Sequence, residues 1–173
     1  MKSFILFTTV VAAGLIPAHG EDSTTPLTRI ALGSCARQNQ PQPIWDNIVA
    51  AEPDLFLFLR DHIYGDSKHM AVLREKYAQL DAKPGFQKLR SKIPLLAIWD
   101  DHDYGADDAG AEYPMRAESQ KLFLDFFKEP AESPRRQREG IYNARIFGPP
   151  GKRVQIILLD TRYFRGPLNV KPR

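Results

Sequence analysis

Three apolar runs in this sequence each lead directly into side chains that could bind a metal ion. Residues 94–99 lead into Asp100-Asp101-His102-Asp103, residues 30–33 into Ser34-Cys35, and residues 55–59 into Arg60-Asp61-His62-Ile63-Tyr64. Such runs are typical of buried parallel strands, which lie about 4.8 Å apart with their carboxyl ends at one edge of the sheet. The sequence therefore predicts one pocket lined by Cys35, Asp61, Tyr64, Asp101 and His102.

A pocket of this composition could hold two metal ions. A carboxylate shared by two cations can support a metal-activated water that attacks a phosphorus atom in line with the leaving group. Thiolate and phenolate ligands suit iron better than magnesium, whereas additional carboxylates suit a hard cation such as calcium. The acidic run at residues 100–103 favours a cation site, because adjacent carboxylates repel one another unless a positive charge offsets them.

Each candidate ligand also has a plain structural interpretation. Asp61 could be a turn residue at a strand end, and Tyr64 could be a packing aromatic. Cys35 is the one cysteine of the chain, so it cannot close an internal disulfide, and by position alone it favours a buried apolar role. We expect His62 to be exposed or to orient a neighbouring ligand.

The remaining acids and histidines of these segments are expected to be peripheral. Asp100 and Asp103 are expected mainly to orient neighbouring ligands. Asp107 and Asp108 are expected to be solvated loop acids, and His69 to be solvated at a helix start.

Three other functional motifs are disfavoured. Ser34 lies in Gly33-Ser34-Cys35-Ala36, which is not the G-x-S-x-G elbow of a serine hydrolase. A helix–loop–helix calcium site starting at Asp101 would place Gly105 one position too early. The sequence contains no zinc-type Cys-x-x-Cys pair and no phosphate-cradling glycine loop.

Length and composition fit one globular domain. The chain has 173 residues, of which 43% are hydrophobic, and a net charge of +3 that is too small to indicate nucleic-acid binding. The densest positive cluster, Arg135-Arg136-Gln137-Arg138, is interpreted as a solvated loop.

The first residues predict a signal peptide. Lys2 precedes a largely apolar stretch at residues 4–16, and Ala18-His19-Gly20 places small residues at a cleavage site. A bilayer span takes roughly 20 residues, so this stretch favours a cleaved leader over a membrane anchor. We therefore expect a signal peptide at 1–20, a lead-in at 21–28 and a periplasmic or secreted domain at 29–173.

Apolar periodicity predicts alternating strands and helices followed by a hairpin. The expected strands are 30–33, 55–59 and 95–99, the expected helices are 43–52, 70–80, a segment opened by Pro84 and 116–127, and the expected hairpin joins 141–147 to 154–159. The turn signal Pro149-Pro150-Gly151-Lys152 separates the hairpin strands. This order is typical of an α/β sandwich with ligands at the carboxyl ends of its strands.

Four motifs together resemble the alkaline phosphatase D (PhoD-like) family of calcineurin-like metallophosphoesterases. They are Gly33-Ser34-Cys35, Asp61-His62-Ile63-Tyr64, Trp99-Asp100-Asp101-His102-Asp103 and Leu159-Asp160-Thr161-Arg162. The resemblance covers residues 30–168. It implies part of an αββα sandwich with a mixed, mainly parallel sheet, and hydrolysis of phosphomonoesters or phosphodiesters at alkaline pH with Fe³⁺ and Ca²⁺ as cofactors.

The resemblance also implies roles for individual residues. Cys35 and Tyr64 look like iron ligands, and Asp61 looks like the carboxylate that bridges the two ions. Asp101 stands where the wider superfamily has a metal-binding asparagine. His102 stands where it has the catalytic histidine that stabilises the leaving or attacking oxygen.

Two departures from the family pattern bear on activity. The family has glycine where this chain has Arg60, whose charge could repel a cation or bind a substrate phosphate. Later family ligands have no counterpart after Asp160, so the chain is similar to the amino-terminal half of such an enzyme and is expected to be impaired by truncation.

Three function classes follow from these observations. The first is an exported phosphoesterase acting on a phosphate ester, with no nucleic-acid, transmembrane or protein partner implied. The second is a non-catalytic remnant that binds metal or phosphate, and the third is a thiol-reactive protein that uses Cys35.

Overall fold

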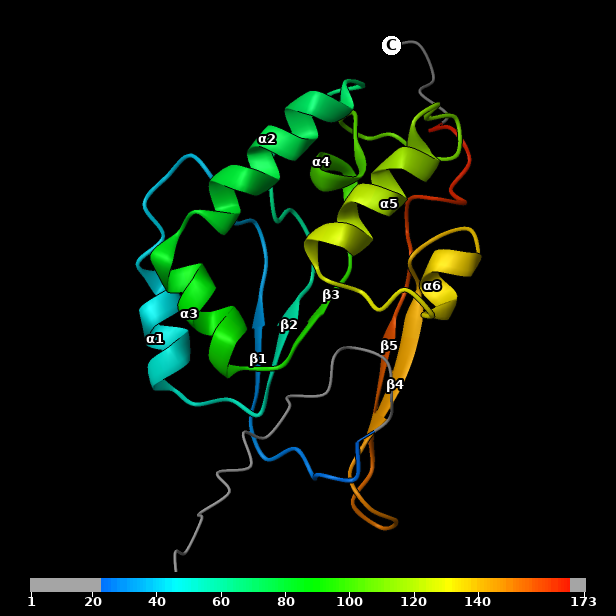
Figure 1. The fold of residues 1–173 in the computed structure, drawn as a ribbon. Helices are drawn as coiled ribbons and strands as arrows, with labels where there is room; N and C mark the ends of the chain where they lie inside the picture. The colour runs from blue at the N-terminus through cyan, green and yellow to red at the C-terminus, as the bar shows by residue number, and fades with distance from the viewer. Residues whose placement is uncertain (1–22, 169–173) are drawn as a thin grey trace, which may run out of the picture.

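The computed structural model describes residues 23–168, so the predicted signal peptide at 1–20 lies outside the described residues. Strands and helices alternate along the chain, which then ends in a hairpin, as predicted (Figure 1). Part of the predicted lead-in is ordered by pairing, since Ser23 donates its N–H to Ile146 O at 3.0 Å and accepts from Gly148 N at 2.7 Å.

The central sheet contains three parallel strands in the order β1-β2-β3. Their bounds are Ile30–Gly33 for β1, Leu55–Phe58 for β2 and Leu95–Ala97 for β3. Every residue of β2 is buried, as its uninterrupted apolar sequence predicts for a central strand covered on both faces. Because the strands run in one direction, the residues after each strand emerge at the same edge.

Aromatic packing fixes two helices against this sheet. Trp45 of α1 (Ile44–Ala50) lies edge-on to Phe58 of β2, with ring centroids 5.6 Å apart. Phe86 of α3 (Pro84–Lys92) lies 5.3 Å from Trp45. Burial of each such side chain contributes about 1.5–3 kcal/mol. Pro84 opens α3 at the first turn, where a missing N–H costs nothing.

Two longer helices pack near the carboxyl ends of the strands. Helix α2 (Met70–Asp81) buries Leu73, Tyr77 and Leu80, the stripe expected from helical spacing. Helix α5 (Arg116–Phe126) buries Phe123 and Leu124. Within the described residues, no helix has the length and apolar character needed to cross a membrane.

A separate antiparallel hairpin follows, made of β4 (Asn143–Phe147) and β5 (Val154–Leu158). In Figure 1 it lies on the opposite side of the parallel sheet from α1 and α3. Gly148 and Gly151 adopt positive φ at its turn, at 93° and 84°, where a side chain would be strained. The mixed α/β class with a parallel sheet and a carboxyl-terminal hairpin is therefore confirmed.

Two short helices were not predicted. One is α4 (Asp101–Tyr104), which opens what the sequence indicated as a long acidic loop. The other is α6 (Pro134–Gln137), which starts with a Ser133 cap on Arg135 N. Both have four residues, too few to show an apolar repeat.

The prediction that the Arg135–Arg138 cluster is a solvated loop is wrong for Arg135. Its side chain is buried, and it donates to Glu129 Oε2 at 2.9 Å and to Ile141 O at 3.0 Å. Arg136 pairs with Asp125 at 2.7 Å. Charge density in the sequence did not reveal these partners, which come from separate segments.

Candidate metal centre

The carboxyl ends of the three parallel strands bring the five sequence-predicted residues together. Cys35 follows β1, Asp61 and Tyr64 follow β2, and Asp101 and His102 follow β3. The Cys35 thiol donates to Asp61 Oδ2 at 3.2 Å, and the rings of Tyr64 and His102 lie 4.3 Å apart. Carboxylate oxygens of Asp61, Asp100 and Asp101 all lie within 4.8 Å of one another.

The backbone at these strand ends is unusual. Cys35 and Asp61 adopt positive φ, at 58° and 49°, a region that residues other than glycine rarely occupy. Two hydrogen bonds hold the segments together, from Cys35 N to Arg60 O at 3.2 Å and from Ala36 N to Asp61 O at 2.9 Å. Each such conformation costs on the order of 1–3 kcal/mol and is typical of functional sites.

A capped turn positions the acids that follow β3. Asp103 accepts from Asp100 N at 2.7 Å and from His62 N at 3.2 Å, and its carboxylate also contacts His62 Nδ1. The His62 ring is fully buried and lies 4.1 Å from the ring of Phe58. Of the two expectations for His62, exposure is therefore wrong, and the residue lies where it can orient the two strand-end segments.

Among the three carboxylates that lie within 4.8 Å of one another, those of Asp61, Asp100 and Asp101, Asp61 is the most buried. Its residue is only 5% exposed, and Oδ1 has no hydrogen-bond partner among the described residues. Burial raises the pKa of Asp61 above its ordinary value, against the lowering effect of the Cys35 hydrogen bond. A buried carboxylate oxygen without a donor is costly, and a bound cation would remove that cost. The site therefore fits a metal ion on its own geometry.

Further acids extend the cluster beyond those the sequence singled out. Asp66, His102 and Asp107 form one group with ligand atoms within 4.8 Å, and Asp101, Asp107 and Asp108 form another. His102 Nδ1 lies 2.5 Å from Asp66 Oδ1. Asp107 and Asp108 are exposed, as expected, yet both lie close to Asp101. Asp66 was not predicted as a site residue. Its position, two residues after Tyr64, is the sequence signal that could have indicated it.

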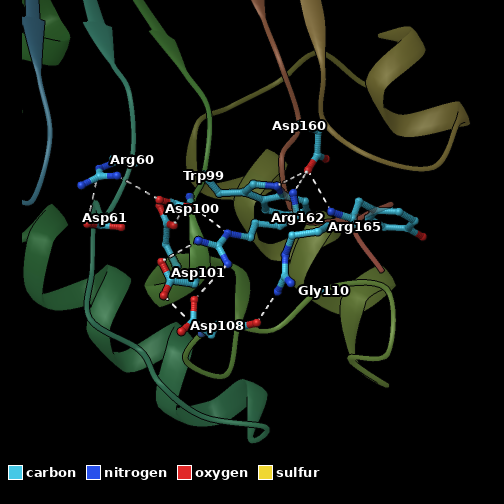
Figure 2. Close-up of polar contacts among 12 residues, drawn as sticks. Arg60, Asp61, Trp99, Asp100, Asp101, Asp108, Gly110, Asp160, Arg162 and Arg165 are labelled. Atoms are coloured by element: carbon cyan, nitrogen blue, oxygen red, sulfur yellow. Dashed lines mark hydrogen bonds and ion pairs between the residues drawn. The ribbon is translucent and has the colours of Figure 1, made fainter. Parts of the chain in front are cut away.

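Two arginines contact the carboxylates (Figure 2). Arg162 reaches Asp100 Oδ1 at 2.5 Å, Asp101 Oδ1 at 3.3 Å and Asp108 Oδ1 at 3.5 Å. Arg60 reaches Asp100 Oδ2 at 3.3 Å, and its Nε lies 3.8 Å from Asp61 Oδ2. The positive charges of Arg60 and Arg162 thus partly neutralise these carboxylates.

Asp160 anchors Arg162 beside the cluster. Its Oδ1 accepts from Trp99 Nε1 at 2.8 Å and from the backbone N–H groups of Arg162 and Tyr163, each at 3.0 Å (Figure 2). Its Oδ2 accepts from Ile141 N at 2.8 Å. With both oxygens occupied by donors, Asp160 fixes the hairpin exit onto the end of β3.

The surroundings of the other candidates shift their pKa values in different directions. Burial and the neighbouring Cys35 raise the pKa of Tyr64, so its phenolate form would need a cation beside it. Partial burial lowers the pKa of His102, but the carboxylates of Asp66, Asp101 and Asp61 together raise it overall. Burial opposes ionisation of Asp101, but the N–H of Asp108, Asp107 and the charge of Arg162 lower its pKa overall.

Comparison with known proteins supports the fold. No family model and no curated protein sequence matches the chain. A solved structure described as "Structure of PhoD" superposes with a TM-score of 0.64 at 15% sequence identity. The match covers 85% of this chain and 34% of that one, so the chain spans about a third of the solved protein. The described part of this protein therefore has a PhoD-like fold.

Proposed function

We propose that this protein is an exported, metal-dependent phosphoesterase of the alkaline phosphatase D type that hydrolyses phosphomonoesters or phosphodiesters. The observation that carries the proposal is Asp61, a buried carboxylate with one oxygen free of donors, placed among further acids, a thiol and an imidazole. Asp160, a structural carboxylate, instead has both oxygens occupied by N–H donors.

The residues divide into ligands and a substrate-facing group. Cys35, Tyr64 and Asp61 would hold Fe³⁺, and Asp61 and Asp101 would hold Ca²⁺. When bound, the ions supply a Lewis acid and an activated water. His102 is held at Nδ1 by Asp66, so its other ring nitrogen, Nε2, is the atom that can donate to a phosphate oxygen. The raised pKa of His102 favours the protonated form that this donation uses.

Two further parts of the proposal concern the chain outside the site. We propose that residues 1–20 direct export and that residues 29–173 form the metallophosphatase domain. The apolar stretch at residues 4–16 and the small residues before Glu21 support the first part.

A phosphatase assay on the chain without residues 1–20 tests the activity. With Fe³⁺ and Ca²⁺ present, p-nitrophenyl phosphate or bis(p-nitrophenyl) phosphate should be hydrolysed at a low rate, and chelation should stop the reaction. Asp61→Asn should lower the rate at least about a hundredfold, on the scale of losing a catalytic metal ligand. Asp46→Asn, an exposed change on α1, is the control. Equal rates for Asp61→Asn and the unaltered chain would reject the proposal.

The second candidate is a non-catalytic protein that binds metal or phosphate. It is favoured by Arg60 and Arg162, whose guanidinium groups already contact the carboxylates of Asp61, Asp100 and Asp101. It predicts that metal binds with the same dependence on Asp61 while neither ester is hydrolysed. Calorimetric titration of Ca²⁺ alongside the phosphatase assay separates the two candidates.

A further inference from the structure

Arg60 contacts the same carboxylates that would bind metal. Its guanidinium lies 3.3 Å from Asp100 Oδ2 and 3.8 Å from Asp61 Oδ2 (Figure 2), and it also interacts with the Cys35 thiol. A guanidinium carries its positive charge at any ordinary pH. A positive side chain therefore lies against the carboxylates to which a cation would bind.

The guanidinium and a metal ion cannot share these oxygens without repulsion. Arg60 contacts Asp61 Oδ2 while Asp61 Oδ1 has no donor among the described residues, so a cation bound at Asp61 brings a second positive centre to the same carboxylate. The repulsion between the two charges favours turning the Arg60 side chain away from Asp61 and Asp100 when a cation binds.

Arg60 is free to move in a way that Arg162 is not. The Arg60 side chain is 54% exposed, whereas that of Arg162 is 14% exposed and contacts three carboxylates. Asp160 also holds the backbone of Arg162 by accepting its N–H. A long exposed side chain can turn into solvent at little packing cost. The two arginines therefore differ in role, Arg162 being structural and Arg60 displaceable.

We infer that Arg60 exchanges partners: it competes with metal ions for Asp61 and Asp100, and the displaced guanidinium binds the phosphate group of the substrate. The inference rests on the metal site of the proposed function and adds a residue that selects the substrate. Residue 60 directly precedes Asp61, so the displaced side chain stays beside the bound cation. A guanidinium matches a phosphate group with two parallel hydrogen bonds.

Two titrations by calorimetry test this exchange. In the first, Ca²⁺ is added to the unaltered chain, Arg60→Gln and Arg37→Gln. Arg37 lies over the Tyr64 ring at 4.5 Å, so its variant removes the same charge without freeing Asp61. Arg60→Gln should bind Ca²⁺ on the order of tenfold more tightly, the scale of an adjacent like charge. Arg37→Gln should change the affinity less than about twofold, since it acts only through the screened field.

In the second titration, phenylphosphonate, which cannot be hydrolysed, is added to the Ca²⁺-loaded proteins. Arg60→Gln should bind it on the order of tenfold more weakly, and Arg60→Lys should recover part of the loss. Unchanged Ca²⁺ affinity in Arg60→Gln, or unchanged phenylphosphonate affinity, would overturn the exchange. If no variant binds Ca²⁺ at all, the proposed metal site itself fails, which is a different result.

Discussion

At the scale of single residues, the partners of each carboxylate decide its role. Asp160 and Asp61 both follow strands, yet Asp160 is occupied by an indole and three backbone N–H groups, whereas Asp61 keeps one oxygen without a donor. Desolvation raises the pKa of Asp61, so its charge is expensive unless a cation is near. The same residue type thus serves as an anchor in one place and as a candidate ligand in the other.

Asp54 gives a residue-scale prediction about stability. Its Oδ2 accepts from Thr28 N at 2.6 Å, Thr28 Oγ1 at 2.8 Å and Arg29 N at 2.8 Å. The Thr28 N–H, the largest cause, and the other donors lower the pKa of Asp54. Asp54→Ala should therefore lower the free energy of unfolding by about 1 kcal/mol after solvent screening. Asp46→Ala, at an exposed ion pair, should have almost no effect.

The stability that Asp54 contributes should depend on pH, because folding lowers the pKa of its carboxyl group. Because the folded chain has the lower pKa, the contribution of Asp54 is complete above the ordinary value of 3.8 and is lost as the pH falls through the folded value. In urea unfolding between pH 7 and pH 2.5, the free energies of unfolding of the unaltered chain and of Asp54→Ala should converge at the acid end. A constant gap across that range would contradict this account.

At the scale of elements, the turn after β3 is held by the buried contact between Asp103 and His62 rather than by helix propensity. Helix α4 has four residues, too few to be stable alone. Asp103 satisfies the N–H groups of Asp100 and His62 together, and so ties the end of β3 to the end of β2. This cross-link sets the spacing of the candidate ligands on the two segments.

Replacing Asp103 tests that cross-link. Asp103→Ala should lower the free energy of unfolding by about 3 kcal/mol, because it leaves two N–H groups and a buried imidazole without their acceptor. Asp107→Ala removes an exposed acid from the same loop and should change stability by less than about 0.5 kcal/mol. Thermal unfolding of both variants provides the measurement. Equal melting temperatures would show that Asp103 does not hold the segments.

At the scale of the whole molecule, one buried ion pair joins the parallel sheet to the hairpin. Arg135 donates to Ala97 O at 3.2 Å, at the end of β3, and to Ile141 O at 3.0 Å, just before β4. Glu129 balances its charge at 2.9 Å, and Ser133 donates to the other Glu129 oxygen at 2.5 Å. The hairpin in turn carries Asp160 and Arg162 to the candidate site.

A double-mutant cycle measures this link. Arg135→Leu alone should cost about 3–5 kcal/mol, because it leaves the Glu129 carboxylate buried and unpaired. Arg135→Leu with Glu129→Leu should recover part of the loss, since neither charge then remains buried. Chemical unfolding of Arg135→Leu, of Glu129→Leu and of the double variant gives the coupling energy. Strict additivity would mean that the two side chains act independently.

Local pattern was enough to predict most of the fold. The continuous apolar run before Arg60 and the helical stripe from Met70 onward became β2 and α2 within a residue or so at each end. Both depend on a short-range periodicity that burial imposes on the sequence. The four-residue helices α4 and α6 were not predicted, because their stability comes from caps and tertiary contacts rather than from periodicity.

By itself, the sequence determined which side chains follow each strand. Because parallel strands bring such residues to one edge of a sheet, Cys35, Asp61 and His102 lie close together. Only the tertiary structure decided that Asp66 holds His102 and that Arg162 lies on Asp101. Those contacts join segments far apart in the chain. Their geometry is set by packing, which leaves no periodic signal in the sequence.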